Sequence, residues 1–260
     1  MKRRHCIAAC IACAGGARVQ ASRPLPAVIG FDEGSLPTMY RSGAPAPAHG
    51  IYPTLVGAAF AQMGRPCELQ AMPFKRLLSE TDAGHVLAGA VIRTPEREQR
   101  WLFSQPYFVE RLAVYGTGAP FKGLDSLAGK HVGVIRGWSY GEAFDNARRQ
   151  GLFQCEEVAA DVNNFAKLMR GRIDYAVATE LGGRMLQQLP AYEGRVLAGG
   201  APLGATPIHL AVLRGLDGAA ALLPSFNAAV ELMHRSGQVD ALVAREIAAA
   251  AELVRLLPAG

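Results

Sequence analysis

The chain has 260 residues, of which half are hydrophobic, and a formal net charge of +5. Residues 1–21 contain four positive charges and no acid, so the 239 residues that follow carry a net charge of only +1. A nearly neutral surface lacks the positive field that attracts a phosphate backbone, so we expect no nucleic-acid partner. The length is sufficient for a sizeable hydrophobic core in one or two compact units.

The N-terminus has the organisation of an export signal. A basic start, Met1–His5, precedes an apolar stretch, Cys6–Ala17, that is too short to anchor the chain in a bilayer. Small residues at the cleavage spacing end at Ala21, which predicts a signal peptide over 1–21, a periplasmic location and a mature protein that does not span a membrane. The sequence around Cys10 also has the form of a short lipoprotein signal, which leaves lipidation as an alternative.

Two cysteines, Cys67 and Cys155, lie outside the signal segment. They are widely separated and each has strand-like neighbours, so we expect two buried thiols rather than a disulfide bridge.

Apolar strands alternate with amphipathic helices in the first half of the mature chain. The pattern predicts strands at 27–31, 68–72 and 86–92, and helices over 52–63 and 74–83. Such alternation is typical of a parallel sheet covered by helices.

A helix start lies between the apolar stretches 86–92 and 112–115. Thr94 can cap the helix, Pro95 suits its first position, and Arg97 then falls in the first turn. The guanidinium group of Arg97 has the planar geometry to bind a carboxylate with two hydrogen bonds. The alternative is an ordinary surface salt bridge.

A second set of elements follows the Gly- and Pro-rich stretch 116–120. We expect strands at 130–135, 153–158 and 173–178, helices over 140–150 and 163–170, a late strand at 208–213, and a tail helix that returns to the first unit. The prediction is therefore an α/β protein with two lobes and a ligand cleft between them. Lobe 1 comprises 22–115 plus 209–260, and lobe 2 comprises 116–208.

Seven short segments occur in an order and spacing that resemble the periplasmic solute-binding proteins, family 3, of ABC-type polar amino-acid uptake systems. They cover nearly the whole mature chain: 29–32, 50–52, 72–76, 94–97, 103–107, 127–134 and 171–174. The resemblance implies the periplasmic binding protein-like type II fold, with two Rossmann-like lobes and a two-segment hinge. It also implies a monomer without cofactor that captures a small carboxylate-bearing solute and delivers it to an ABC permease.

The same resemblance assigns roles to individual residues. Arg97 corresponds to the arginine that holds the ligand's α-carboxylate, and the loop of Gly137, Trp138 and Ser139 corresponds to one that offers a backbone amide and a hydroxyl. Three further residues are expected at the cleft, Phe74 as an apolar wall and the acids Asp32 and Glu33. The alternatives are a core position for Phe74 or Trp138, an ordinary strand-to-helix turn for the loop, and plain solvation for the two acids.

The chain also departs from the family pattern. Many amino-acid binders have an aspartate, which holds the ligand's ammonium group, where this chain has Thr179 followed by Glu180. Serines that usually line the cleft are replaced by Gly89 and Ala90. Either Glu180 takes the place of the aspartate, or the ligand has no α-amino group.

Two other functions remain open. Cyclohexadienyl dehydratases resemble the same family, and in such an enzyme Glu180 or Glu33 would act as the general acid. No nucleophile triad is evident, and the six histidines lack metal-ligand spacing, so we expect neither catalysis nor a metal. A soluble sensor subunit is the third possibility.

Overall fold

The computed structural model describes residues 23–43 and 47–255. The predicted signal peptide and Cys10 lie outside the described residues. Within the described residues, no helix is long and apolar enough to cross a membrane.

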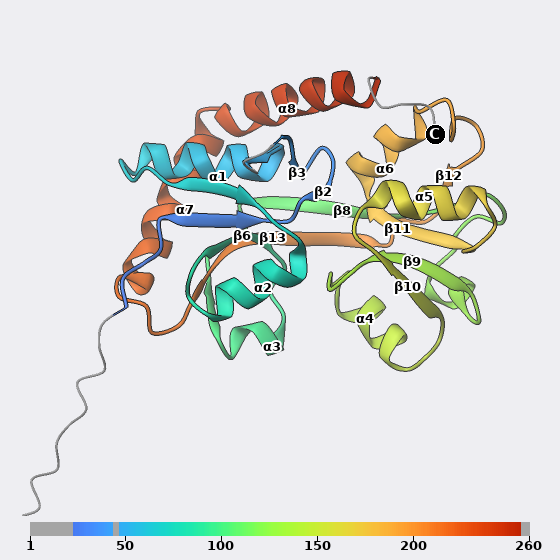
Figure 1. The fold of residues 1–260 in the computed structure, drawn as a ribbon, viewed down its shortest axis with the longest axis horizontal. Helices are drawn as coiled ribbons and strands as arrows, with labels where there is room; N and C mark the ends of the chain where they lie inside the picture. Colours follow the sequence, from blue (N-terminus) through green and yellow to red (C-terminus); the bar gives the residue numbers. More distant parts are fainter. Residues whose placement is uncertain (1–22, 44–46, 256–260) are drawn as a thin grey trace, which may run out of the picture.

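One ten-stranded sheet runs through the whole molecule (Figure 1). Its main path is β10-β9-β11-β8-β13-β6-β1-β5, and two short strands, β7 and β12, pair with β13 and β8. Lobe 1 contains β1 (Val28–Phe31), β5 (Glu68–Ala71), β6 (Leu87–Val91) and β7 (Trp101–Phe103). Lobe 2 contains β9 (His131–Ile135), β10 (Gln154–Val158), β11 (Tyr175–Thr179) and β12 (Leu197–Ala198).

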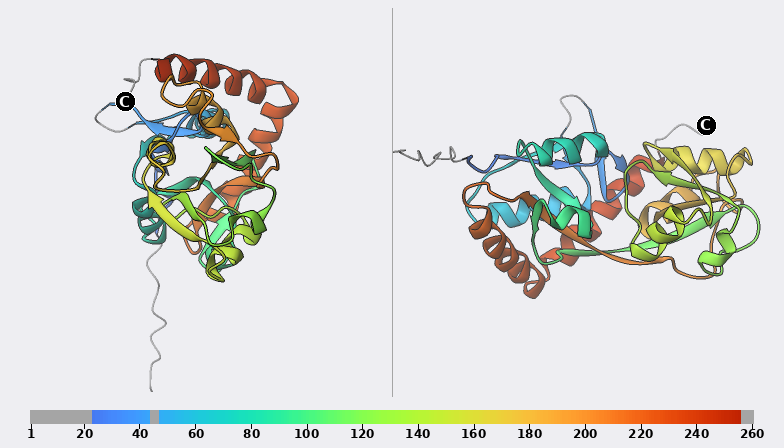
Figure 2. Two further views of the ribbon diagram at one scale, coloured as in Figure 1. Left: turned by 90° about the vertical axis from the view of Figure 1, so that its right-hand side faces the viewer. Right: turned by 90° about the horizontal axis from the view of Figure 1, so that it is seen from below.

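Two long strands connect the lobes, as the sequence predicted. β8 (Phe108–Gly116) leads from lobe 1 into lobe 2, and β13 (Gly204–Leu213) leads back. They pair antiparallel from Gly204 opposite Leu112 to Ile208 opposite Phe108, and the right-hand view of Figure 2 shows both passing between the lobes.

Helices cover both faces of the sheet in lobe 1. α1 (Ile51–Gln62), α7 (Ala219–Arg235) and α8 (Gln238–Arg255) lie on one face, and α2 (Phe74–Asp82) and the short α3 (Pro95–Glu98) lie on the other. The larger core cluster joins α1 and α7 to the sheet through aromatic residues such as Phe31, Phe60 and Phe226. A separate small sheet of β2 (Gly34–Ser35), β3 (Met39–Arg41) and β4 (Ala48–His49) precedes α1.

Lobe 2 repeats this design with α4 (Glu142–Arg149), α5 (Asp161–Met169) and α6 (Glu180–Gln187), and a short 3-10 helix, η1 (Leu124–Leu127). The helices predicted over 140–150 and 163–170 are present, although α4 begins after Gly141 and α5 begins two residues early. α6 was not predicted. It follows β11 directly and packs against β8.

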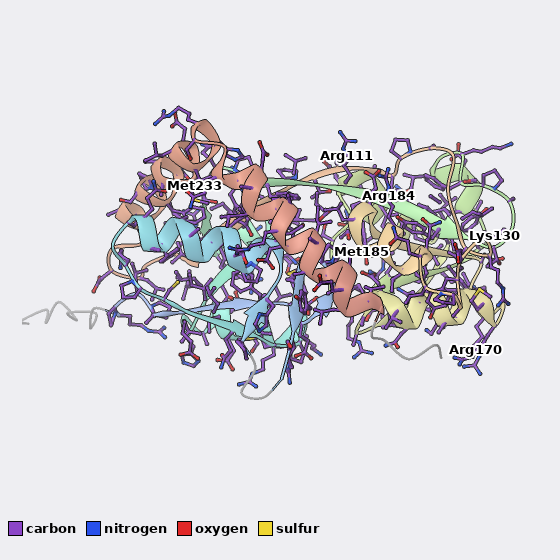
Figure 3. All side chains as sticks on the ribbon, turned by 90° about the horizontal axis from the view of Figure 1, so that it is seen from above. Arg111, Lys130, Arg170, Arg184, Met185 and Met233 are labelled. Carbon is purple, nitrogen blue, oxygen red and sulfur yellow. The ribbon has the colours of Figure 1, made fainter. Side chains whose placement is uncertain are left out.

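The last helix, α8, contacts both lobes. It begins beside α7, packs along α1, and places Ala250 and Val254 in the second-lobe core with Phe165 and Tyr192. Figure 3 shows α8 crossing the molecule from the side of Met233 towards that of Met185. The sequence predicted a tail that returns to lobe 1, and the structure adds this second attachment.

Cys67 and Cys155 are both free thiols and are partly buried. The two thiols are therefore less buried than the sequence led us to expect.

Candidate ligand site between the lobes

Arg97 is placed by the cap of α3. The Thr94 hydroxyl accepts a hydrogen bond from the Arg97 backbone N–H at 3.3 Å, and Pro95 occupies the first helical position. The side chain turns inward and is only 8% exposed. Its Nη1 donates to the carbonyl of Ile92 at 2.9 Å, and its guanidinium carbon lies 5.5 Å from the ring centre of Phe74.

Arg97 is a buried cation. Among the described residues, no Asp or Glu forms an ion pair with it, so the surface salt bridge considered above is not formed. Burial lowers the pKa of Arg97, and nearby acids only partly oppose this effect. A guanidinium group still remains protonated at neutral pH. A buried positive charge of this kind is a natural binding partner for an anion.

Trp138 extends from lobe 2 and contacts lobe 1. Its indole Nε1 donates to Asp32 Oδ2 at 2.8 Å, and its ring meets Phe74 edge to face at 6.2 Å. Phe74 and Trp138 therefore pack against each other in this structure. Their contact joins the two lobes, and both rings also line the cavity between the lobes.

The loop before α4 has a turn that requires glycine, because Gly137 has a φ of 78°. The Trp138 N–H closes the turn by donating to the Ile135 carbonyl at 3.2 Å. Asp145 holds the rest of the loop, because it accepts hydrogen bonds from the Ser139 hydroxyl and from the Tyr140 N–H. In the described part of the chain, the N–H groups of Gly137 and Ser139 have no partner, so they can donate to a ligand.

Five of the nine predicted site residues line one cavity of about 40 Å³ between the lobes: Phe74, Arg97, Trp138, Ser139 and Thr179. Gly137 lines an adjoining hollow of about 580 Å³, which shares Arg97, Trp138 and Ser139 with the central cavity. The central cavity is thus much narrower than the adjoining hollow.

Asp32 and Glu33 lie on the other side of Phe74. Together they line a hollow of about 480 Å³ that does not include Arg97. Burial raises the pKa of Asp32 to about 6, and its hydrogen bonds from the Glu33 N–H and the Trp138 indole oppose the rise. Glu33 forms an ion pair with Arg41 at the surface.

Glu180 does not reach the cavity. Its carboxylate forms an ion pair with Arg184, and it lines a separate hollow with Arg111 and Tyr115. Thr179 does line the cavity, and its hydroxyl caps α6 by accepting from the Gly182 N–H at 3.1 Å. Thr179 and Glu180 are adjacent in the sequence, but only Thr179 lines the central cavity.

Several polar residues of the cavity were not expected from the sequence, among them Tyr52, Glu110 and Thr206. Glu110 is buried in β8, and burial raises its pKa to about 7 despite a hydrogen bond from the Tyr52 hydroxyl. The sequence does contain a signal for the burial of Glu110. Glu110 lies on the same strand face as Leu112 and Val114, because alternate residues of a strand point the same way.

No group of three or more potential ligands is close enough to hold a metal ion among the described residues.

The fold and the cleft define a class of protein, a two-lobed α/β protein with a candidate ligand site between the lobes. The chain belongs to the bacterial extracellular solute-binding proteins, family 3, because the model of that family matches residues 27–248. No curated protein sequence gives a significant match.

Solved structures show the same fold. The sensor domain of a histidine kinase, described as similar to periplasmic binding proteins, has a TM-score of 0.74 at 21% identity, covering 86% of this chain and 96% of that one. An ancestral arginine-binding protein bound to arginine has a TM-score of 0.70 at 24% identity, with 84% and 96% covered. An amino-acid ABC transporter substrate-binding protein from Streptococcus pneumoniae, bound to L-arginine, has a TM-score of 0.71 at 19% identity, with 86% and 95% covered.

Proposed function

We propose that this protein captures a small carboxylate-bearing solute between its lobes, in the periplasm and as a monomer, and delivers it to an ABC permease. The observation that carries the proposal is Arg97, a buried guanidinium that lines the central cavity and has no protein counter-ion among the described residues. Membership of the solute-binding family supports binding as the activity, and the name of the Streptococcus pneumoniae neighbour supports an ABC transporter as the partner.

Binding is coupled to closure because the two lobes supply different parts of the site. Arg97 comes from lobe 1, while the Gly137 and Ser139 amides come from the loop of lobe 2. A solute held by Arg97 alone would favour neither the open nor the closed form of the protein. A solute that also accepts hydrogen bonds from lobe 2 favours the closed form. The permease can then distinguish loaded from unloaded protein by the separation of the lobes.

The two acids considered for a dehydratase-like reaction are poorly placed for it. Glu180 and Glu33 each pair with an arginine and stay partly exposed, whereas a general acid at neutral pH needs an environment that disfavours its charge. Binding without chemistry is the simpler account of the cleft.

Arg97→Ala tests the proposal. The probes are L-arginine, L-glutamine, further L-amino acids and their 2-hydroxy acid counterparts, titrated by calorimetry. We expect the variant to lose about 10- to 100-fold or more in affinity for every carboxylate that the wild type binds, since a charge-assisted hydrogen bond pair is removed.

Arg100→Ala is the matched control, because Arg100 is three residues away, pairs with Asp82 at the surface and lines neither the central cavity nor the adjoining hollow. It should leave affinity within about twofold of the wild type, as expected for a surface charge. Unchanged binding by Arg97→Ala would overturn the assignment of the carboxylate site.

A further inference from the structure

Three consecutive residues of lobe 1, Gly34, Ser35 and Leu36, meet lobe 2 at a place outside the central cavity. They comprise β2 and the residue after it, and Figure 1 shows β2 on the side of lobe 1 that faces α5 and α6. None of the three lines the central cavity, so they are not part of the candidate ligand site. We call residues 34–36 the docking segment.

The backbone at Gly34 lies directly against the backbone that leads into α5. A Cβ at Gly34 would be 2.2 Å from the Ala159 carbonyl oxygen and 3.2 Å from the Cα of Ala160. Gly34 does not have a positive φ, which is the backbone conformation that favours glycine. The close approach of lobe 2, rather than the conformation of the chain, is therefore what requires glycine here.

The next two residues complete the contact between the lobes. The buried Ser35 hydroxyl donates to Asp161 Oδ2, in the first turn of α5, at 3.4 Å. The partly buried side chain of Leu36 packs against the core cluster of lobe 2 that contains Phe165. The docking segment thus makes a backbone contact at Gly34, a polar contact and an apolar contact with lobe 2.

Lobe 2 contributes a glycine of its own to this contact. A Cβ at Gly182, in the first turn of α6, would be 2.7 Å from the Leu36 carbonyl oxygen. It would also be 2.8 Å from the Thr179 hydroxyl, which accepts a hydrogen bond from the Gly182 N–H. Glycine is a poor helix former. Gly182 therefore weakens α6 as a helix but leaves room for its cap and for the docking segment.

We propose that the docking segment positions lobe 1 against the starts of α5 and α6 when the lobes close, and that Gly34 and Gly182 are positioning residues for this closure. They lie outside the cavity and let the lobes approach far enough for Arg97 and Ser139 to line one space. The effect on ligand affinity rests on the proposed function. Because the contact contains no ligand atom, it stabilises the closed form equally for every ligand.

Gly34→Ala tests the docking segment. The added methyl group overlaps the Ala159 carbonyl only while the lobes are closed, so the variant should favour the open form. We expect calorimetry to show about 5- to 100-fold lower affinity for each amino acid or hydroxy acid that the wild type binds. The ratio of affinities between any two probes should stay the same, which a residue that contacts the ligand would not give.

Gly118→Ala is the matched control, because a Cβ there meets nothing within 4 Å and Gly118 also lacks a positive φ. It should leave affinity within about twofold of the wild type. If Gly34→Ala fails to fold, Leu36→Ala replaces it. This change removes the apolar contact with lobe 2 without adding an atom, and it should lower the affinity for every probe by about 3- to 10-fold.

The outcomes separate this inference from the proposed function. Unchanged affinity in Gly34→Ala, or a loss that differs between probes, overturns the role of the docking segment and leaves the carboxylate site intact. If no probe binds the wild type, the proposed function fails, and small-angle X-ray scattering of the ligand-free proteins decides the inference. A larger radius of gyration for Gly34→Ala than for the wild type then supports it, and equal radii overturn it.

Discussion

At the scale of single residues, the indole of Trp138 links the two lobes directly. It donates to a buried carboxylate of lobe 1, Asp32, and packs against three core clusters, two of lobe 1 and one of lobe 2. The donor and the acceptor lie in different lobes, so separation of the lobes must break this hydrogen bond. It must also hydrate Asp32, which is 2% exposed in this structure. Trp138 therefore contributes to the equilibrium between open and closed forms.

Trp138→Phe should shift the ligand-free protein towards the open form. Phenylalanine keeps an aromatic ring near Phe74 but removes the donor to Asp32, which weakens the closed form by about 1–3 kcal/mol. Small-angle X-ray scattering should show a larger radius of gyration than that of the wild type.

Trp101→Phe is the control for this change. The Trp101 indole also donates to an aspartate at 2.8 Å, but its partner is Asp82 in the same lobe. It should lower the stability of the protein without opening it. Equal scattering from Trp138→Phe and wild type would contradict the linking role of Trp138.

At the scale of elements, the centre of lobe 1 depends on a close approach between β1 and β6. The Phe31 ring lies over Gly89, where an added Cβ would be 2.2 Å from a ring carbon. The Tyr107 hydroxyl also donates to the Gly89 carbonyl at 2.8 Å. Phe31 thus occupies the space that a side chain at 89 would need, which gives a structural reason for one departure from the family pattern.

Gly89→Ala should therefore destabilise the fold. The extra methyl group forces Phe31 or the strand to move, at a cost of about 1–3 kcal/mol, measured by chemical denaturation. Gly118→Ala is the control, because a Cβ there meets nothing within 4 Å. The account fails if the two variants are equally stable, and a smaller residue at 31 should partly rescue Gly89→Ala.

The periodic spacing of apolar residues was sufficient to predict the helices and strands that bury one face against the core. β1, β5, β6, β9, β10 and β11 all appear within two residues of the predicted strands, and α1 and α2 within one. The site was predictable where a local rule applied, as with the Thr94 cap that turns Arg97 inward. The resemblance to the family supplied the rest of the expected pocket.

The features that escaped prediction depend on tertiary contacts. α6 contains Gly182 and Gly183, which lower helix propensity by about 1 kcal/mol each. In the fold, the Tyr115 ring packs directly on Gly183, so the glycine that argues against a helix is what allows the helix to pack. Glu110 was missed for a related reason, because a charged residue in a strand is ordinarily taken to face solvent.

At the scale of the whole molecule, three connections control the separation of the lobes. β8 and β13 form the continuous part of the sheet, and α8 spans both cores on the face shown in Figure 3. Two acids then meet the opposite lobe directly: Asp32 accepts from Trp138, and Asp161 accepts from the Ser35 hydroxyl at 3.4 Å. Closure buries both carboxyl groups.

Burial raises the pKa of Asp32 to about 6 and that of Asp161 to about 7, and the charge of Asp32 adds to the rise at Asp161. The charged groups that face them are Glu33, Lys75, Arg76 and Arg136 around Asp32, and Glu110 near Asp161. When the lobes part, both carboxyl groups gain water and their pKa values return towards about 4. The closed form therefore binds more protons than the open form.

The ligand-free protein should consequently close as the pH falls. The contribution of these acids to closure is complete below about pH 4 and is lost as the pH rises through the closed-form values of about 6 and 7. We expect the closing equilibrium constant to be about tenfold or more higher near pH 5.5 than near pH 7.5, measured as a decrease in the radius of gyration by scattering.

Asp161→Asn should reduce this dependence, whereas Glu156→Gln, which alters a surface acid paired with Lys167, should leave it unchanged. A radius that stays constant with pH, or that decreases as the pH rises, would show that the buried acids do not govern closure.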